Sequence, residues 1–294
     1  MFESIRRGFG FLGQAITLAG KDRDLLKPSL ISLVVSTVVA VIGAVPLIAV
    51  AVIGGGSNIT QYILYVLGAL LIFAQYAVAY VFSGMTAYLI YGLLAEGDGR
   101  MDKAWAIVRR DALDIVSLAA ASTVVKLVEN ALRGRRGRGN LAGGLLASIL
   151  DTVWTTATYF VLPAMVIEDL NLPQALKRAT YIVKNNLLLV AVTEIGVSAV
   201  VGFIGILLVL AAVAVGAAIF VVLVNVHLIL ALAVAVPVAG LLIALLTAFT
   251  SYVTTAYHTC LFLWAREAER AVGQGYAVEA AAVPAPLAAV LARA

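Results

Sequence analysis

The stretch LISLVVSTVVAVIGAVPLIAVAVIG, Leu30–Gly54, decides the fold class of this 294-residue chain. It carries no charged side chain and is longer than the about 20 residues that a membrane-spanning helix needs. A membrane-spanning β-strand would alternate polar and apolar residues, and this stretch does not alternate. The sequence therefore predicts a helix in lipid, with a kink where Pro46 removes a backbone donor.

The composition of the whole chain agrees with that stretch. Hydrophobic residues make up 63% of the sequence, charged residues 12%, and the mean hydropathy is +1.06. Soluble domains carry about 25% charged residues, so a soluble fold is excluded. We expect an all-α polytopic membrane bundle of about six transmembrane helices with amphipathic surface helices. Its expected parts are an N-terminal interfacial segment (1–27), a membrane domain (28–265) and a surface or disordered tail (266–294).

The N-terminal segment has the pattern of a helix that lies in the membrane surface. Its apolar residues recur at helical spacing, opposite Glu3, Arg6 and Arg7: Phe2, Ile5, Phe9, Leu12 and Ile16. This amphipathic pattern is typical of an interfacial helix.

The region from Ser29 to Ala95 contains no charged residue and is long enough for two spans. GGGSN, Gly54–Asn58, is the expected turn. The second helix, about 60–95, would measure about 54 Å against a hydrocarbon core of about 30 Å. It must tilt, bend near Gly84, or extend into another layer of protein.

The second half of the chain is more interrupted. Ile115–Leu132 carries Lys126 and Glu129, and the basic turn RGRRGRGN separates it from the apolar stretch Leu141–Ile167. Leu187–Ala265 contains one carboxylate and no Lys or Arg, and would form two or three spans. Asn225 and His227 fit a turn between spans, although a histidine there could also respond to protons.

The positions of the basic residues leave two topologies open. Basic residues at the N-terminus, at Arg100–Arg110 and at Lys177–Lys184 favour the cytoplasmic side. If all three regions are inside, Ile115–Leu132 and Leu141–Ile167 form a hairpin with RGRRGRGN outside. If Ile115–Leu132 is instead a surface or re-entrant helix, that turn lies inside and Lys177, Arg178 and Lys184 lie outside. We favour the hairpin, inserted fully or in part.

The stretch FVLPAMVIEDLNLPQALKRATYIVKNN, Phe160–Asn186, marks a place where the chain leaves the bilayer. Glu168 and Asp169 meet water, and Pro173 suits the first turn of a new helix. That helix can turn one side to the membrane and its basic residues away from it. The expected membrane-facing residues are Leu172, Leu176, Ala179 and Val183.

The same residues carry a family resemblance. YFVLPAMVIEDLNLPQALKRAT, with LLASILDTVWTTATYF before it, resembles an uncharacterised prokaryotic family of multi-pass membrane proteins. KDRDLLKPSLIS and TAYHTCLFLWA resemble the start of that family's first span and its final helix. More distantly, the pattern is similar to the membrane domain of some glycerophosphodiester phosphodiesterases. The resemblance implies the architecture and no activity.

Ionisable residues inside apolar helices are the candidates for function, because each is expensive in lipid. Asp151, Thr155 and Thr158 share one helix face and could line a polar path, with Glu194 as a further member. The structural alternative is that Asp151 bonds a Ser or Thr of a neighbouring helix, and that Glu194 reaches the interface or pairs with a lysine. Gln75 is expected to make an interhelical hydrogen bond.

A second group of residues would contact lipid headgroups. The basic turn and the surface helix supply it: Arg133, Arg135, Arg136, Arg138, Lys177 and Arg178. The turn has no aromatic residue for base stacking, so lipid is favoured over nucleic acid. The lone Cys260 excludes an intramolecular disulfide, and we expect no metal and no cofactor.

These observations favour a non-catalytic integral protein of the prokaryotic cell membrane. We expect a scaffold or assembly subunit that binds lipid and partner helices, as a homo-oligomer or with other membrane proteins. Small-residue faces such as Ala212/Gly216 and Gly196/Val200 would pack on partners. The alternative is a channel or transporter whose path is lined by Asp151, Thr155 and Thr158.

Overall fold

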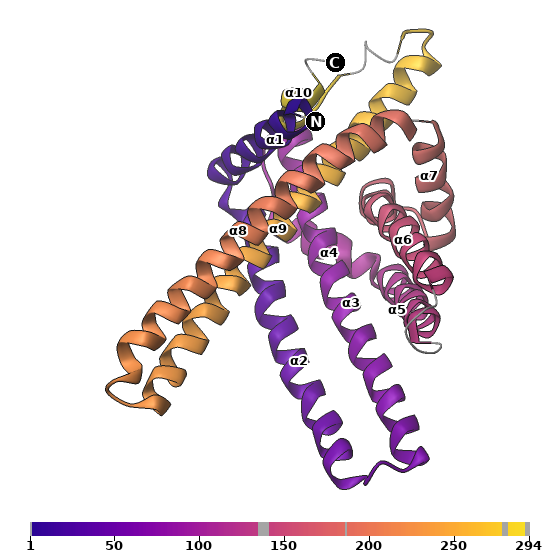
Figure 1. Ribbon diagram of the computed structural model, residues 1–294. Helices are drawn as coiled ribbons and strands as arrows, with labels where there is room; N and C mark the ends of the chain where they lie inside the picture. The colour runs from indigo at the N-terminus through magenta and orange to yellow at the C-terminus, as the bar shows by residue number, and fades with distance from the viewer. Residues whose placement is uncertain (1, 135–140, 186, 278–281, 292–294) are drawn as a thin grey trace. The chain divides into compact units, whose positions relative to one another are not determined.

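The computed structural model describes residues 2–134, 141–185, 187–277 and 282–291, and these residues form helices and connecting turns with no strand (Figure 1). The helices follow one another in this order: α1 Phe2–Lys21, the short 3-10 helix η1 Arg23–Leu26, α2 Lys27–Ile53, α3 Asn58–Glu96, α4 Met101–Arg110, α5 Ala112–Gly134, α6 Leu141–Glu168, α7 Leu172–Asn185, α8 Leu187–Val224, α9 Leu228–Gly273 and α10 Ala285–Leu291. The all-α prediction is confirmed.

Five helices in the described part of the chain are long and apolar enough to cross a membrane. They are Arg23–Ile53, Asn58–Glu96, Gly143–Glu168, Val200–Val224 and Leu228–Gly273. The protein is therefore a multi-pass membrane protein. The count is five where the sequence suggested about six, and α5 is not among the five.

The chain divides into two compact units. The first contains residues 1–33 and 186–294, and the second contains residues 34–185. The first seven residues of α2 belong to the first unit and the rest of α2 to the second.

In the first unit, α8 and α9 form a long antiparallel hairpin (Figure 1). The apolar stretch Leu187–Ala265 thus supplies two helices and not three. The break lies at Asn225–His227, where the Nδ1 atom of His227 accepts a hydrogen bond from the Ile229 amide at 3.2 Å. His227 is therefore the N-cap of α9, as the turn interpretation predicted.

A small-residue face joins the two arms of this hairpin. Ala212 and Gly216 on α8 are buried, and a Cβ added at Gly216 would lie 2.7 Å from the Cβ of Ala239 on α9. The face expected to meet a partner helix is thus occupied within the same chain. In the second expected face, Val200 is buried. The surroundings of Gly196 lie outside what the structure describes.

Helix α1 packs on α8, α9 and α10 and still exposes apolar side chains. Phe11 and Ala15 are fully buried, and the Ala15 carbonyl accepts a 3.0 Å hydrogen bond from the Tyr252 hydroxyl. Phe9 and Ile16, from the predicted interfacial stripe, are about half exposed at 48% and 51%. In the tail, α9 continues to Gly273, and α10 buries Leu287 against the α1–α9 region.

In the second unit, α2 and α3 form a hairpin through a glycine turn. Gly55 and Gly56 have φ values of +59° and +76°, a left-handed conformation that glycine adopts without strain. The Gln75 amide donates a 2.9 Å hydrogen bond to the Ser36 carbonyl, which confirms the predicted interhelical bond.

The excess length of α3 is buried in protein. The helix has 39 residues, or about 58 Å. Its first half is exposed, whereas Met85, Leu89 and Ile90 in its second half are covered by α4, α5 and α6. Of the three options that the sequence left open, extension into a second layer of protein is the one observed.

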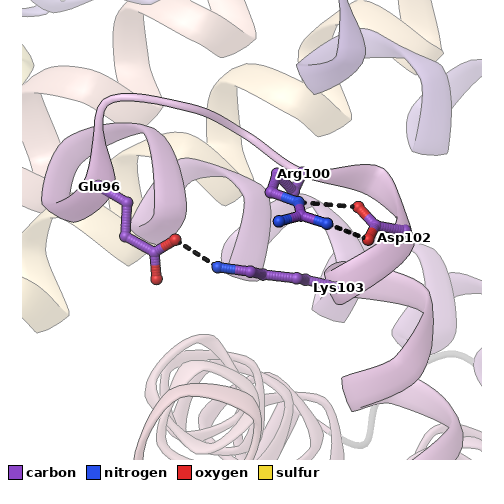
Figure 2. A network of polar contacts seen from close by, with 4 residues as sticks. All are labelled: Glu96, Arg100, Asp102 and Lys103. Atoms are coloured by element: carbon purple, nitrogen blue, oxygen red, sulfur yellow. Dashed lines mark hydrogen bonds and ion pairs between the residues drawn. The ribbon is translucent and has the colours of Figure 1, made fainter.

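A polar network marks the end of α3 (Figure 2). Gly97 closes the helix with a φ of +79°, and Lys103 on α4 then reaches back to Glu96 at 2.6 Å. Arg100 contacts Asp102 at 2.6 Å. The Arg100 hydrogen bond lowers the pKa of Asp102, and the Glu96 hydrogen bond raises the pKa of Lys103. These four charged side chains are exposed, as expected at an end of the unit that meets water.

Helix α7 follows α6 as predicted, but its apolar side packs on protein. Ala175, Ala179 and Ile182 are fully buried, because α7 lies against α6. The Glu168 carboxylate holds Arg178 in two bonds of 2.8 and 3.2 Å. Of the four residues expected to face the membrane, Ala179 is buried against protein, whereas Leu172, Leu176 and Val183 are partly exposed.

Candidate functional site

Three of the predicted path residues line a single polar cavity in the second unit. The cavity has a volume of about 180 Å³ and lies between α3, α5 and α6. We call it the polar pocket. Its lining residues are Tyr76, Tyr80, Ser122, Val125, Lys126, Glu129, Asp151, Trp154, Thr155, Thr158 and Tyr159.

Helical spacing explains why these side chains converge. Asp151, Thr155 and Thr158 are related as i, i+4 and i+7 on α6, and so are Ser122, Lys126 and Glu129 on α5. Residues at these intervals lie on one face of a helix. Since α5 packs on both α3 and α6, the polar faces meet.

The inner end of the polar pocket is closed by a hydrogen-bonded cluster. The Ser122 hydroxyl lies 2.7 Å from the Tyr80 hydroxyl and accepts a 2.9 Å hydrogen bond from the Trp154 indole N–H. Thr158 is 7% exposed and donates to the Thr155 carbonyl at 2.8 Å. Beyond Thr158, α6 continues into the buried apolar core from Phe160 to Val166. The pocket is therefore blind at this end.

The outer end of the polar pocket carries charge. Glu129 is only 2% exposed, and its two oxygens bind Lys126 at 2.7 Å and Arg133 at 2.6 Å. Asp151 is exposed and makes no hydrogen bond or ion pair with the residues that the structure describes. The pocket thus combines a satisfied carboxylate, Glu129, a partly engaged ammonium, Lys126, and a second carboxylate, Asp151, that interacts with Lys126 only at longer range.

Aromatic rings form one wall of the polar pocket. Tyr76 and Tyr80 stack with ring centroids 5.7 Å apart and an interplanar angle of 14°. Trp154 and Tyr159 contribute from α6. Faces of such rings attract cations, most strongly where water is excluded.

A second, larger cavity lies beside α3 and α5. It has a volume of about 920 Å³, and we call it the apolar groove. The residues that line it are Tyr65, Val66, Ala69, Leu127, Val128, Asn130, Ala131 and Leu132. Only one of these side chains, that of Asn130, ends in an amide; the others are apolar or aromatic.

The remaining predicted site residues lie elsewhere or outside the description. The side chains of Glu194, Arg135, Arg136 and Arg138 are not among the described residues. Arg133 binds Glu129 and Arg178 binds Glu168, so both predicted headgroup contacts are engaged in ion pairs. Lys177 is exposed.

The sequence interpretation missed several pocket residues. It noted Lys126 and Glu129 only as charges within an apolar stretch, and it gave no role to Tyr76, Tyr80 or Ser122. The i, i+4 spacing of the two tyrosines was a usable signal. What the sequence lacked was knowledge of which helix faces meet.

Metal-binding groups of three or more His, Cys, Asp and Glu side chains are absent from the described part of the chain. Cys260 is buried, and the Nδ1 atom of His258 lies 2.8 Å from the Thr254 carbonyl.

Comparison with known families places the polar pocket inside a shared region. Residues 60–272 match a family of unknown function, DUF6159. This range runs from the start of α3 almost to the end of α9 and contains every lining residue of the pocket. A search of curated proteins finds no match.

Proposed function

Because the chain belongs to DUF6159, a family of unknown function, we infer its function from its own residues. We propose that it is a non-catalytic, lipid-binding membrane protein. The polar pocket between α3, α5 and α6 holds the polar head of an amphiphile from the bilayer. The observation that carries this proposal is a polar pocket that ends at a buried hydrogen-bonded cluster and whose outer carboxylate, Asp151, is exposed.

The far side of α6 faces lipid at the level of Asp151. Ile149 and Val153, each two positions from Asp151 and on the opposite side of the helix, are exposed at 59% and 62%. In a bilayer such side chains contact hydrocarbon. A ligand that binds Asp151 at this depth needs an apolar part as well as a polar one.

The gradient of exposure along α6 favours binding over conduction. Asp151 is exposed, Thr155 is intermediate and Thr158 is buried. A conducting path needs polar groups or water along its whole length. Here the polar residues end at the apolar core, which supports a site that captures a ligand.

The bonding inside the polar pocket supports a non-catalytic role. Ser122 is four residues from Lys126, a spacing that could pair a nucleophile with a base. The Ser122 hydroxyl is instead engaged by Tyr80 and Trp154, and the Lys126 ammonium is bonded to Glu129. A protonated lysine in an ion pair is a poor base.

The cellular role that fits is a scaffold or assembly subunit of a prokaryotic cell membrane, with itself or other membrane proteins as partners. Lipid bound in the second unit would stabilise that unit during assembly. The distant resemblance to the membrane domain of glycerophosphodiester phosphodiesterases remains a further expectation, and the proposal does not depend on it.

Lipid retention tests the proposal directly. The purified protein is delipidated in detergent, and its melting temperature is followed as a total lipid extract is added. We expect a saturable rise for the wild type and a smaller rise for Thr155→Val, which removes a lining hydroxyl. Thr152→Val is the matched control, because the Thr152 hydroxyl bonds the Ser148 carbonyl on the exposed side of α6. An unsaturable rise, or equal rises in both variants, contradicts the proposal.

The alternative function is a channel or transporter, which the meeting of Asp151, Thr155 and Thr158 in one cavity favours. A flux assay in liposomes separates the two functions. Ion or solute flux that Asp151→Asn abolishes would support transport, and its absence beside saturable lipid binding supports the proposed function.

A further inference from the structure

We propose that the polar pocket and the apolar groove together form one binding site for a phospholipid with an ammonium headgroup. The inference rests on the proposed function and names its ligand class. The ammonium faces Asp151 and the tyrosine wall, the phosphate faces Lys126, and an acyl chain lies in the apolar groove.

The charges of the polar pocket match a zwitterion. Glu129 is satisfied, because each of its oxygens already binds one cation. Asp151 makes no direct ion pair or hydrogen bond with the described residues and interacts with Lys126 only at longer range, so an incoming cation can pair with this carboxylate. The Lys126 ammonium has three N–H donors and uses one on Glu129, which leaves donors for an anion. A headgroup with both charges engages both residues.

The aromatic wall favours an ammonium as the cationic part. Tyr76 and Tyr80 line the same cavity as Asp151. Aromatic rings beside a carboxylate are the arrangement by which proteins bind alkylammonium groups. A purely anionic headgroup would place its charge near Asp151 without compensation.

One face of α3 connects the polar pocket to the apolar groove. Tyr65 and Ala69 line the groove, and Tyr76 and Tyr80 line the pocket. At about 100° per residue these four positions fall within a narrow sector of the helix. Ala69 and Tyr76 are separated by seven residues, or about 10 Å along the axis.

Helix α5 lines both cavities with different faces. Lys126 and Glu129 line the polar pocket, and Leu127 and Val128, on the opposite side of the helix, line the apolar groove. The face of α3 is therefore what runs from one cavity to the other, with charged groups in the first and apolar side chains in the second. This is the distribution of a lipid's headgroup and chain.

Headgroup selectivity tests the inference. Delipidated protein is titrated with phosphatidylethanolamine, phosphatidylglycerol and a synthetic dialkylammonium lipid without phosphate, and binding is read by native mass spectrometry. We expect phosphatidylethanolamine to bind about tenfold more tightly than either of the others, a difference of about 1.4 kcal/mol. Equal affinity for all three overturns the inference and leaves the proposed function intact, whereas no saturable binding of any lipid sinks both.

Two variants locate the selectivity. Asp151→Asn should remove the preference over phosphatidylglycerol, and Asp98→Asn, in the loop between α3 and α4, should keep it. Asp151 is exposed and has no partner among the described residues, so its replacement should not impair folding. Loss of the preference in both variants, or in neither, contradicts the assignment.

The groove is tested separately with Ala69→Trp, which fills it. This variant should weaken phosphatidylethanolamine binding and leave the binding of free phosphoethanolamine unchanged. If free phosphoethanolamine binds the wild type as tightly as the lipid does, the apolar groove has no part in the site.

Discussion

Asp151 shows how one residue can be identified from sequence while its role depends on the structure. A carboxylate in an apolar helix is costly, and that cost alone made the residue a candidate. Its expected alternative, a bond to Ser or Thr of a neighbouring helix, is not observed among the described residues. The serine of the neighbouring helix, Ser122, is instead engaged by Tyr80 and Trp154. Sequence could not predict this, because both partners come from different helices.

The Ser122 cluster gives a stability prediction. Ser122→Ala leaves the Tyr80 hydroxyl and the Trp154 N–H without their shared partner, at a cost of about 1–3 kcal/mol in unfolding free energy. Ser117→Ala on the same helix is the control, since its exposed hydroxyl bonds only the Leu113 carbonyl. Denaturant titration in detergent measures both. Equal losses would show that the cluster contributes nothing beyond the helix.

The Arg100–Asp102 pair gives a prediction in pH. The hydrogen bond lowers the pKa of Asp102 below 3.8, its ordinary value. Because the pKa is lowered in the folded protein, the pair stabilises the fold at pH values above the ordinary pKa. This stabilisation is lost as the pH falls through the lowered pKa. NMR titration of the wild type should give a pKa under 3.8 for the Asp102 carboxyl. In Arg100→Gln this pKa should rise towards 3.8. An identical value in both proteins contradicts the pairing.

At the scale of elements, hydropathy predicts that helices exist, and packing decides what each one does. Asn225 and His227 mark the break between α8 and α9, whereas Pro237 and Gly240, residue types that also interrupt helices, lie inside α9. The sequence predicts an apolar membrane face on α7, and one of its four residues, Ala179, is instead buried in the unit that contains α6. In a membrane protein, apolar residues contact both lipid and protein, so the hydropathy pattern does not distinguish a lipid-facing side of a helix from a packed one.

The two-part character of α3 can be tested with matched glycines. A Cβ at Gly84 would lie 3.3 Å from the Val166 side chain, and one at Gly68 would meet nothing within 4 Å. We expect Gly84→Leu to cost about 1–3 kcal/mol through overpacking. Gly68→Leu should be close to neutral or stabilising. Thermal unfolding in detergent compares them, and a neutral Gly84→Leu would mean that the second half of α3 is not packed as described.

At the scale of the whole molecule, the charged regions around α4 and α7 meet within the second unit. Arg110, at the end of α4, binds Asp169, just after α6, at 2.9 Å. This contact places the end of α4 and the start of α7 close together, as the hairpin topology requires and the alternative topology, with the basic residues of α7 outside, does not. The turn between α2 and α3 lies at the opposite end of α3.

Single-cysteine labelling tests this placement. The native Cys260 is fully buried, so it should give little background with a membrane-impermeant reagent. We expect cysteines at Arg109 and Lys177 to react from one side of the membrane and a cysteine at Asn58 to react from the other. Arg109 and Lys177 labelled from opposite sides would contradict the arrangement.

The most direct measurement of the central claim is a cryo-EM map of the protein in nanodiscs made from native lipid. The account predicts headgroup density in the polar pocket, within hydrogen-bond reach of Asp151 and Lys126, continuous with chain density in the apolar groove. A well-resolved pocket that holds only water, with every lipid on the outer surface of the helices, would contradict it.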